Sequence, residues 1–138
     1  MKNFESGNRL IEDAEIYYNE MEMVFKKGRW NIVVRRAQEV VELSLKGILK
    51  IACIDYPKIH DVAPLFVKFI KEKKLEVDEK MLEKILNISE KLAKERAPAF
   101  YGEKIYNEEE AKEAIEGAKE VLDFVKNLKI KLMKKEMN

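Results

Sequence analysis

Apolar residues recur at every third or fourth position along almost the whole chain, and this spacing is the strongest constraint on the fold. Side chains so spaced share one face of an α-helix, and that face has to be buried against another element. Only five Gly and three Pro interrupt the pattern in 138 residues. The spacing predicts four long helices and one short helix, over roughly 5–26, 29–54, 61–70, 78–97 and 107–132.

Polar residues with short side chains mark the starts of three of these helices. Asp61 precedes an apolar stripe and is a predicted N-cap, and the fourth helix is predicted to start near Asp78. Asn107 is followed by three glutamates, so Asn107 and Glu110 are predicted to form a variant of the capping box. These signals indicate where the third, fourth and fifth helices begin.

Pro98 is the main predicted stop within the second half of the chain. Proline lacks a backbone N–H and disfavours helix at the residue before it, so the fourth helix should end there. The segment 97–106 is then the least regular part of the chain. Arg96 is expected at the helix end, where a basic residue can satisfy the last carbonyl groups.

The predicted elements define the fold class. No strand-like alternation, internal repeat or flexible linker is present, so residues 1–138 are expected to form a single domain. Four long helices joined by short connections imply an all-α, antiparallel up-and-down four-helix bundle with an additional short helix.

The scarcity of metal-binding and redox residues excludes several classes of site. One cysteine, Cys53, rules out an intramolecular disulfide framework and a Cys-based zinc site. One histidine, His60, argues against a multi-histidine metal site, and we predict neither a metal nor a cofactor. No glycine-rich phosphate loop, Gly-x-Ser-x-Gly elbow or His-Glu-x-x-His motif is present. Cys53 is expected to be a small buried apolar residue near a helix end.

Charge and hydropathy predict a cytoplasmic protein with no membrane contact. The N-terminal region lacks the apolar stretch of a signal peptide, and no run approaches the roughly 20 residues needed to span a bilayer. The 27 basic residues nearly balance the 26 acidic ones, so no global field attracts nucleic acid. The 22 Lys and 21 Glu against one Gln give a thermophile-like composition.

Locally, the charge is uneven. Residues 5–22 carry six acids and one base, whereas 26–36 carry five bases and no acid. The segment 103–120 is again acidic, and 126–138 is basic. Solvated helix faces with acids at helix starts and bases at helix ends explain this pattern. Complementary patches that pair two subunits or attract a charged partner are the alternative.

One stretch of the second helix carries a recognisable pattern. It reads A-x-x-x-x-E-x-x-x-K-x-x-L from Ala37 through Glu42 and Lys46 to Leu49, and the turn Pro57-Lys58-Ile59-His60-Asp61 follows. Arg96, a loop with Pro and Tyr, and an acidic start to an Ala-rich last helix come later. In this order and spacing, residues 5–130 resemble a HEPN domain, the helical partner of minimal nucleotidyltransferases.

The resemblance implies a bundle that is commonly homodimeric, encoded beside a nucleotidyltransferase or acting in toxin–antitoxin and defence systems. Many HEPN proteins are metal-independent ribonucleases with an Arg-x4–6-His motif. This chain departs from that motif, because no histidine follows Arg96 at any permitted spacing. Tyrosine titrates near 10 and arginine above 12, so neither is an effective base at neutral pH.

The remaining polar residues favour binding over cleavage. We expect Arg96 to anchor a phosphate, with Tyr101 or Tyr106 stacking on a base or packing over the bundle end. Glu42 and Lys46 are either an intrahelical ion pair or a ligand-facing pair. His60 is either a structural residue of its turn or, oriented by Asp61, a base acting with Arg96.

Three functions therefore remain open from sequence. The first is a non-catalytic HEPN-like binding module that partners a nucleotidyltransferase and helps to bind nucleotide or RNA-like substrate. The second is an atypical metal-independent ribonuclease toxin that uses Arg96 with His60 or a tyrosine. The third is a purely structural homodimeric scaffold.

Overall fold

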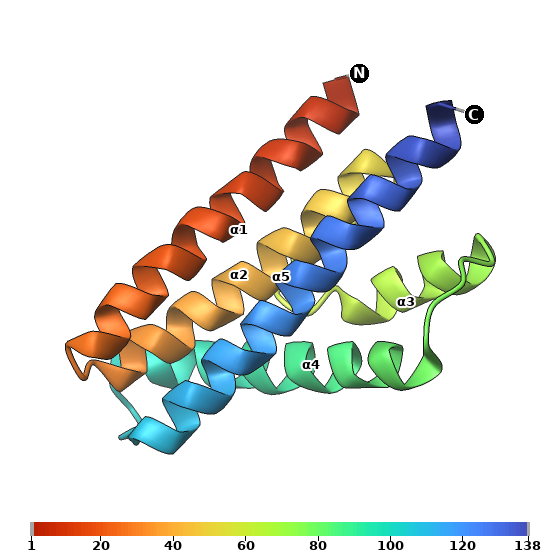
Figure 1. The fold of residues 1–138 in the computed structure, drawn as a ribbon. Coiled ribbons are helices and arrows are strands. Elements are labelled where there is room, and N and C mark those ends of the chain that lie inside the picture. Colours follow the sequence, from red (N-terminus) through yellow and green to blue (C-terminus); the bar gives the residue numbers. More distant parts are fainter. Residues whose placement is uncertain (1, 138) are drawn as a thin grey trace.

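The computed structural model describes residues 2–137, and no strand occurs among them. Its helices are α1 (Lys2–Lys26), α2 (Trp30–Ile51), α3 (Ala63–Glu72), α4 (Glu79–Tyr101) and α5 (Glu108–Met137). The predicted all-α fold, an antiparallel up-and-down bundle with one short extra helix, is confirmed. In Figure 1, α1, α2 and α5 run side by side, with α1 opposite in direction to the other two, and α4 crosses them.

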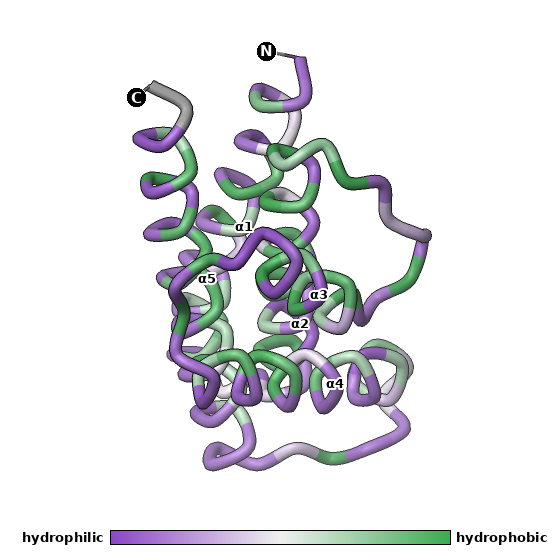
Figure 2. The backbone as a smooth tube through the Cα atoms, turned by 90° about the vertical axis from the view of Figure 1, so that its right-hand side faces the viewer, coloured by the Kyte–Doolittle hydropathy of each residue, from purple (hydrophilic) through white to green (hydrophobic). Residues whose placement is uncertain are grey.

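The central element of the bundle is α2. It contacts each of the other helices, and 11 of its 22 residues are buried. The broad apolar stripe of this helix follows from that position, because a helix covered on several sides needs a wide apolar face. Along the outer helices in Figure 2, hydrophobic and hydrophilic residues alternate within each turn, as one-sided burial requires. No described helix is long and apolar enough to cross a membrane.

Two glycines allow α1 and α2 to approach closely. A Cβ on Gly7 would lie 2.5 Å from the carbonyl oxygen of Gly47, and a Cβ on Gly47 would lie 2.8 Å from the carbonyl oxygen of Gly7. Neither position can accept a side chain without separating the two helices. This contact fixes the register of α2 against α1.

The predicted cap of the last helix and the predicted start of the fourth helix near Asp78 are confirmed. The Asp78 side chain accepts a hydrogen bond from the Lys80 N–H at 3.0 Å. Asn107 Oδ1 accepts from the Glu110 N–H at 2.8 Å, and Glu110 Oε1 accepts from the Asn107 N–H at 3.2 Å. Side-chain oxygens thus satisfy N–H groups that a helix start leaves without backbone partners.

The predicted stop at Pro98 is wrong, because α4 continues to Tyr101 and ends at Gly102 in the left-handed conformation (φ 67°). Proline costs this helix one backbone hydrogen bond. Packing of the last turn offsets the loss: Ala99 is buried, and the Arg35 guanidinium lies 4.2 Å from the centre of the Phe100 ring. Arg96 therefore lies inside the helix and does not cap its end.

Two smaller expectations also need correction. The N-cap of α3 is Val62, one position after Asp61, although the Asp61 side chain still accepts a hydrogen bond from the Ala63 N–H at 3.2 Å. Cys53 is exposed and adopts a positive φ of 61°, where α2 ends. It occupies the left-handed position that often follows a helix, a position that glycine usually fills.

Candidate functional site

A polar strip runs along one side of the otherwise apolar α2. Gln38, Glu42 and Lys46 are spaced by four residues, so they lie one above another on the same helix face. Gln38 Nε2 donates to Glu42 Oε1 at 2.9 Å, and Lys46 Nζ donates to Glu42 Oε2 at 2.7 Å. The predicted ion pair between Glu42 and Lys46 is confirmed, and the Glu42 carboxylate is the centre of this strip.

Arg96 reaches the strip from α4. Its Nη1 donates to Gln38 Oε1 at 2.5 Å, and Gln38 itself is buried. Arg96 forms no salt bridge with any carboxylate among the described side chains, so its partner is a neutral amide. An amide carries no negative charge that could compensate the guanidinium.

His60 joins the other end of the strip. Its Nδ1 lies 2.8 Å from Glu42 Oε1, and its side chain is 53% exposed. The expected orienting role of Asp61 is wrong, because Asp61 accepts a hydrogen bond from the Ser89 hydroxyl at 2.6 Å instead. We call Gln38, Glu42, Lys46, His60 and Arg96 the Arg96 cluster.

The Arg96 cluster sets the ionisation of Glu42. Burial of the carboxyl raises its pKa, but hydrogen bonds from Gln38, Lys46 and His60 outweigh burial and leave the pKa below its ordinary value. Glu42 is therefore a stable carboxylate at neutral pH. Burial and the nearby Glu42 charge raise the pKa of Tyr56, whose ring lies 5.4 Å from Lys46 Nζ.

A small cleft opens beside Arg96 between α1, α2 and α4. Its volume is about 150 Å³, and Arg96 and Glu42 line it. The other lining residues are Tyr17, Glu39 and Leu43. Arg36 neutralises Glu39 through a 2.9 Å ion pair and lies 5.0 Å over the Tyr17 ring. The charge that faces the cleft without an ionic partner is therefore that of Arg96.

The two tyrosines of the 97–106 region do not lie together. Tyr101 is 69% exposed and packs edge-to-face on Phe100, with 4.8 Å between ring centres. Tyr106 is buried between α4 and α5, where its hydroxyl donates to the Glu95 carboxylate at 2.5 Å. Burial and the Glu95 hydrogen bond raise the pKa of Tyr106. Tyr106 packs over the bundle end, apart from the Arg96 cluster.

Gln38 is the site residue that the sequence analysis did not single out. It lies four residues before Glu42 on the same helix face, and it is the only glutamine in the chain. A lone amide at a core position of an apolar helix is a usable signal, because a buried polar group requires a hydrogen-bond partner. Its partner on α4 could not be inferred from spacing along α2.

Comparison with known proteins places this arrangement in a family. The HEPN domain family matches residues 8–128. The chain belongs to the HEPN family. No curated protein matches the sequence significantly.

Two solved structures resemble most of the HEPN bundle described above. TT1696 from Thermus thermophilus has a TM-score of 0.69 at 21% identity, covering 88% of this chain and 96% of its own. ST0689, an archaeal HEPN homologue, has a TM-score of 0.67 at 22% identity with the same coverage, 88% and 96%. Both similarities concern the fold.

The Arg-x4–6-His motif of HEPN ribonucleases lacks its histidine in this chain. The three positions that it allows after Arg96 hold Tyr101, Gly102 and Glu103. The chain's single histidine, His60, is linked to Arg96 only through Gln38 and Glu42. The cluster thus offers an anion-binding guanidinium and, two side chains away, a histidine paired with a carboxylate.

Proposed function

We propose that this protein is a non-catalytic HEPN binding module that holds a phosphate group of a nucleotide or RNA-like ligand at Arg96. In this proposal it partners a nucleotidyltransferase, and a toxin–antitoxin pair is the context that the family suggests. Glu42 and Lys46 orient the cluster, and Tyr101 supplies an exposed aromatic surface near the same end of α4.

The observation that carries the proposal is the neutral partner of Arg96. Of the other arginines of this region, Arg36 pairs with the carboxylates of Glu20 and Glu39, and Arg35 lies 3.9 Å from Glu39 and stacks on the Phe100 ring. Arg96 is held by the Gln38 amide instead, beside a cleft of about 150 Å³. An arginine that is fixed in orientation and has no carboxylate partner among the described side chains suits bidentate recognition of phosphate.

Exposed apolar residues support a protein partner on the adjoining surface. Phe100, Tyr101 and Ile105 are 51%, 69% and 95% exposed at the end of α4 and in the loop that follows. Large apolar side chains grouped on a surface are typical of interfaces. We propose that this surface meets a second copy of the chain or the nucleotidyltransferase subunit. The Ile105→Asp variant should lower the mass measured by light scattering, or abolish co-purification with the nucleotidyltransferase.

The binding test compares three variants by fluorescence anisotropy with labelled ATP and a short single-stranded RNA. Arg96→Ala should weaken binding about tenfold or more, because one charge-assisted contact is lost. Gln38→Glu should weaken it similarly, since the new carboxylate neutralises Arg96 without removing it. Lys94→Ala, on the exposed side of the same helix, is the matched control and should bind normally.

Circular dichroism and melting temperature verify that each variant is folded. Equal binding by all four proteins, or no binding by wild type, would refute phosphate recognition at Arg96. The structural scaffold would then be the remaining hypothesis, provided that the protein is a homodimer in solution.

The Glu42–His60 pair favours a second candidate, a metal-independent ribonuclease. A carboxylate 2.8 Å from an imidazole nitrogen can orient a histidine as a general base. Cleavage of transfer RNA in the presence of chelator, lost in both Arg96→Ala and His60→Ala, would establish this activity. Equal cleavage by wild type and both variants would identify a contaminating nuclease.

A further inference from the structure

A groove far from the Arg96 cluster lies where α2, α3 and α5 end. Its volume is about 230 Å³. The rings of Phe66 and Phe124 join α3 to α5 at 6.1 Å between centres, and the groove opens over the last residues of α2. Its apolar lining residues are Ile51, Ala52, Phe69, Leu75 and Leu132. We call this surface the lysine groove, after the two lysines that complete the lining.

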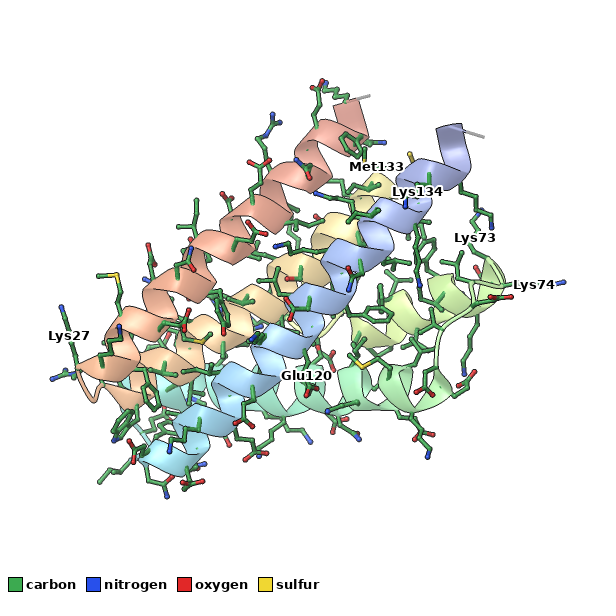
Figure 3. All side chains as sticks on the ribbon, in the orientation of Figure 1. Lys27, Lys73, Lys74, Glu120, Met133 and Lys134 are labelled. Carbon is green, nitrogen blue, oxygen red and sulfur yellow. The ribbon has the colours of Figure 1, made fainter. Side chains whose placement is uncertain are left out.

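Those lysines come from the ends of two different helices. Lys73 ends α3, and Lys135 lies in the last turn of α5. The nearby Lys68 and Lys71 have Glu72 and Glu79 within 3.9 Å, whereas Lys73 and Lys135 form no ion pair with any described side chain. Figure 3 shows Lys73, Lys74 and Lys134 on the side of the molecule where α3 and α5 end.

Lysines close to helix C-termini are favoured by the helix dipole, so their charge alone indicates no ligand. The combination does: the groove brings apolar residues together with two ammonium groups that have no ionic partner among the described side chains. A carboxylate or phosphate head bound by Lys73 and Lys135 would supply a counter-charge, while its alkyl chain covers Phe69, Leu75 and Leu132. An anion without an alkyl chain would leave the apolar residues of the groove exposed to water. A neutral hydrocarbon would supply no counter-charge to the two lysines.

The size of the groove limits the ligand. The groove, about 230 Å³ in volume, suits a single short alkyl chain rather than a large ligand. This volume is too little for a helix or an extended peptide, which would need several such pockets in a row. We propose that the lysine groove is a binding site for a free, medium-chain amphiphilic anion, such as an alkyl carboxylate or alkyl phosphate.

The test is a chain-length series measured by calorimetry on the full-length protein, at concentrations where the ligands are monomeric. Each added methylene should tighten binding about fourfold from hexanoate to octanoate, because each is buried against the apolar residues of the groove. Decanoate should gain little more, since its extra methylenes extend into water. Octyltrimethylammonium, with the same chain and the opposite charge, should not bind.

A double variant tests the two lysines together. The double change of Lys73→Glu and Lys135→Glu should abolish octanoate binding and leave Arg96-dependent nucleotide binding unaltered. Lys119→Glu, an exposed lysine elsewhere on α5, is the matched control and should bind octanoate like wild type. Backbone amide shifts on titration should be confined to the residues lining the groove.

Three results would overturn the proposal: affinity independent of chain length, equal binding of the ammonium amphiphile, or equal weakening by Lys119→Glu. Binding to anionic vesicles without any binding of monomeric octanoate would also overturn it, because it would identify a membrane surface as the ligand. Melting temperatures of all variants separate loss of the site from loss of the fold.

Discussion

The contact between Gln38 and Arg96 should contribute measurably to stability as well as to binding. Gln38→Ala removes two hydrogen bonds to charged groups, the 2.5 Å bond from Arg96 and the 2.9 Å bond to Glu42. Each such bond is worth about 1.5–3 kcal/mol. Because Arg96 and Glu42 are partly exposed, we take the lower end and expect a loss of about 3 kcal/mol for Gln38→Ala. Arg96→Ala should lose about 1.5 kcal/mol.

A double-mutant cycle isolates the contact itself. Urea unfolding of wild type, both single variants and the double variant should give a coupling free energy of about 1.5 kcal/mol, because the double variant loses the shared bond only once. Ser89 provides a matched control: it is buried on the same helix as Arg96 but bonds to Asp61. Gln38→Ala combined with Ser89→Ala should therefore be additive. Additivity of Gln38→Ala and Arg96→Ala within about 0.5 kcal/mol would show that the contact contributes nothing.

Three further predictions concern stability. The pKa of Glu42 is lowered in the folded protein, so its contribution is complete above the ordinary value of 4.5 and is lost as pH falls through the folded pKa. Melting temperatures from neutral pH to about pH 3 should therefore fall less steeply for Glu42→Gln than for wild type, and parallel curves would contradict this. Cys53→Gly should stabilise by about 0.5–1 kcal/mol, since glycine tolerates the positive φ of 61° at the end of α2. A loss of stability in chemical denaturation would show that the cysteine side chain matters more than its backbone. Gly47→Ala should destabilise by about 1–3 kcal/mol, because its Cβ would meet the Gly7 carbonyl oxygen at 2.8 Å and Ile11 at 2.7 Å. An unchanged unfolding midpoint would mean that α1 can shift without cost.

Local signals in the sequence were sufficient for the helices and most of their ends. The period of the apolar residues identified five helices, and Asp78 and Asn107 marked two starts correctly. Pro98 was misjudged because its cost is local whereas the compensation is not: Ala99 packs in the core, and Phe100 packs on Arg35 of another helix. Helix propensity describes each residue in its local segment, so it contains no information about the contact between Phe100 and Arg35.

In the candidate site, too, some contacts follow from local spacing and others from the tertiary structure. The spacing of Glu42 and Lys46 along α2 was enough to predict their ion pair, because i,i+4 residues on one helix must be neighbours. Which carboxylate pairs with His60 depends on how the 52–62 segment returns to α2, and the structure selects Glu42 over the adjacent Asp61. Arg96 and Gln38 are separated by 58 positions in sequence.

The amino-acid sequence by itself thus determined the helical class, the order of the elements and the residues able to carry charge chemistry, since all of these depend on periodicity and side-chain type. Only the tertiary structure decided that Arg96 is held by a neutral amide, that Tyr106 lies apart from it, and that Lys73 and Lys135 face one groove. These facts depend on helix crossings and on the register between helices distant in the chain. Packing of the whole core sets that register, and no local spacing rule encodes it.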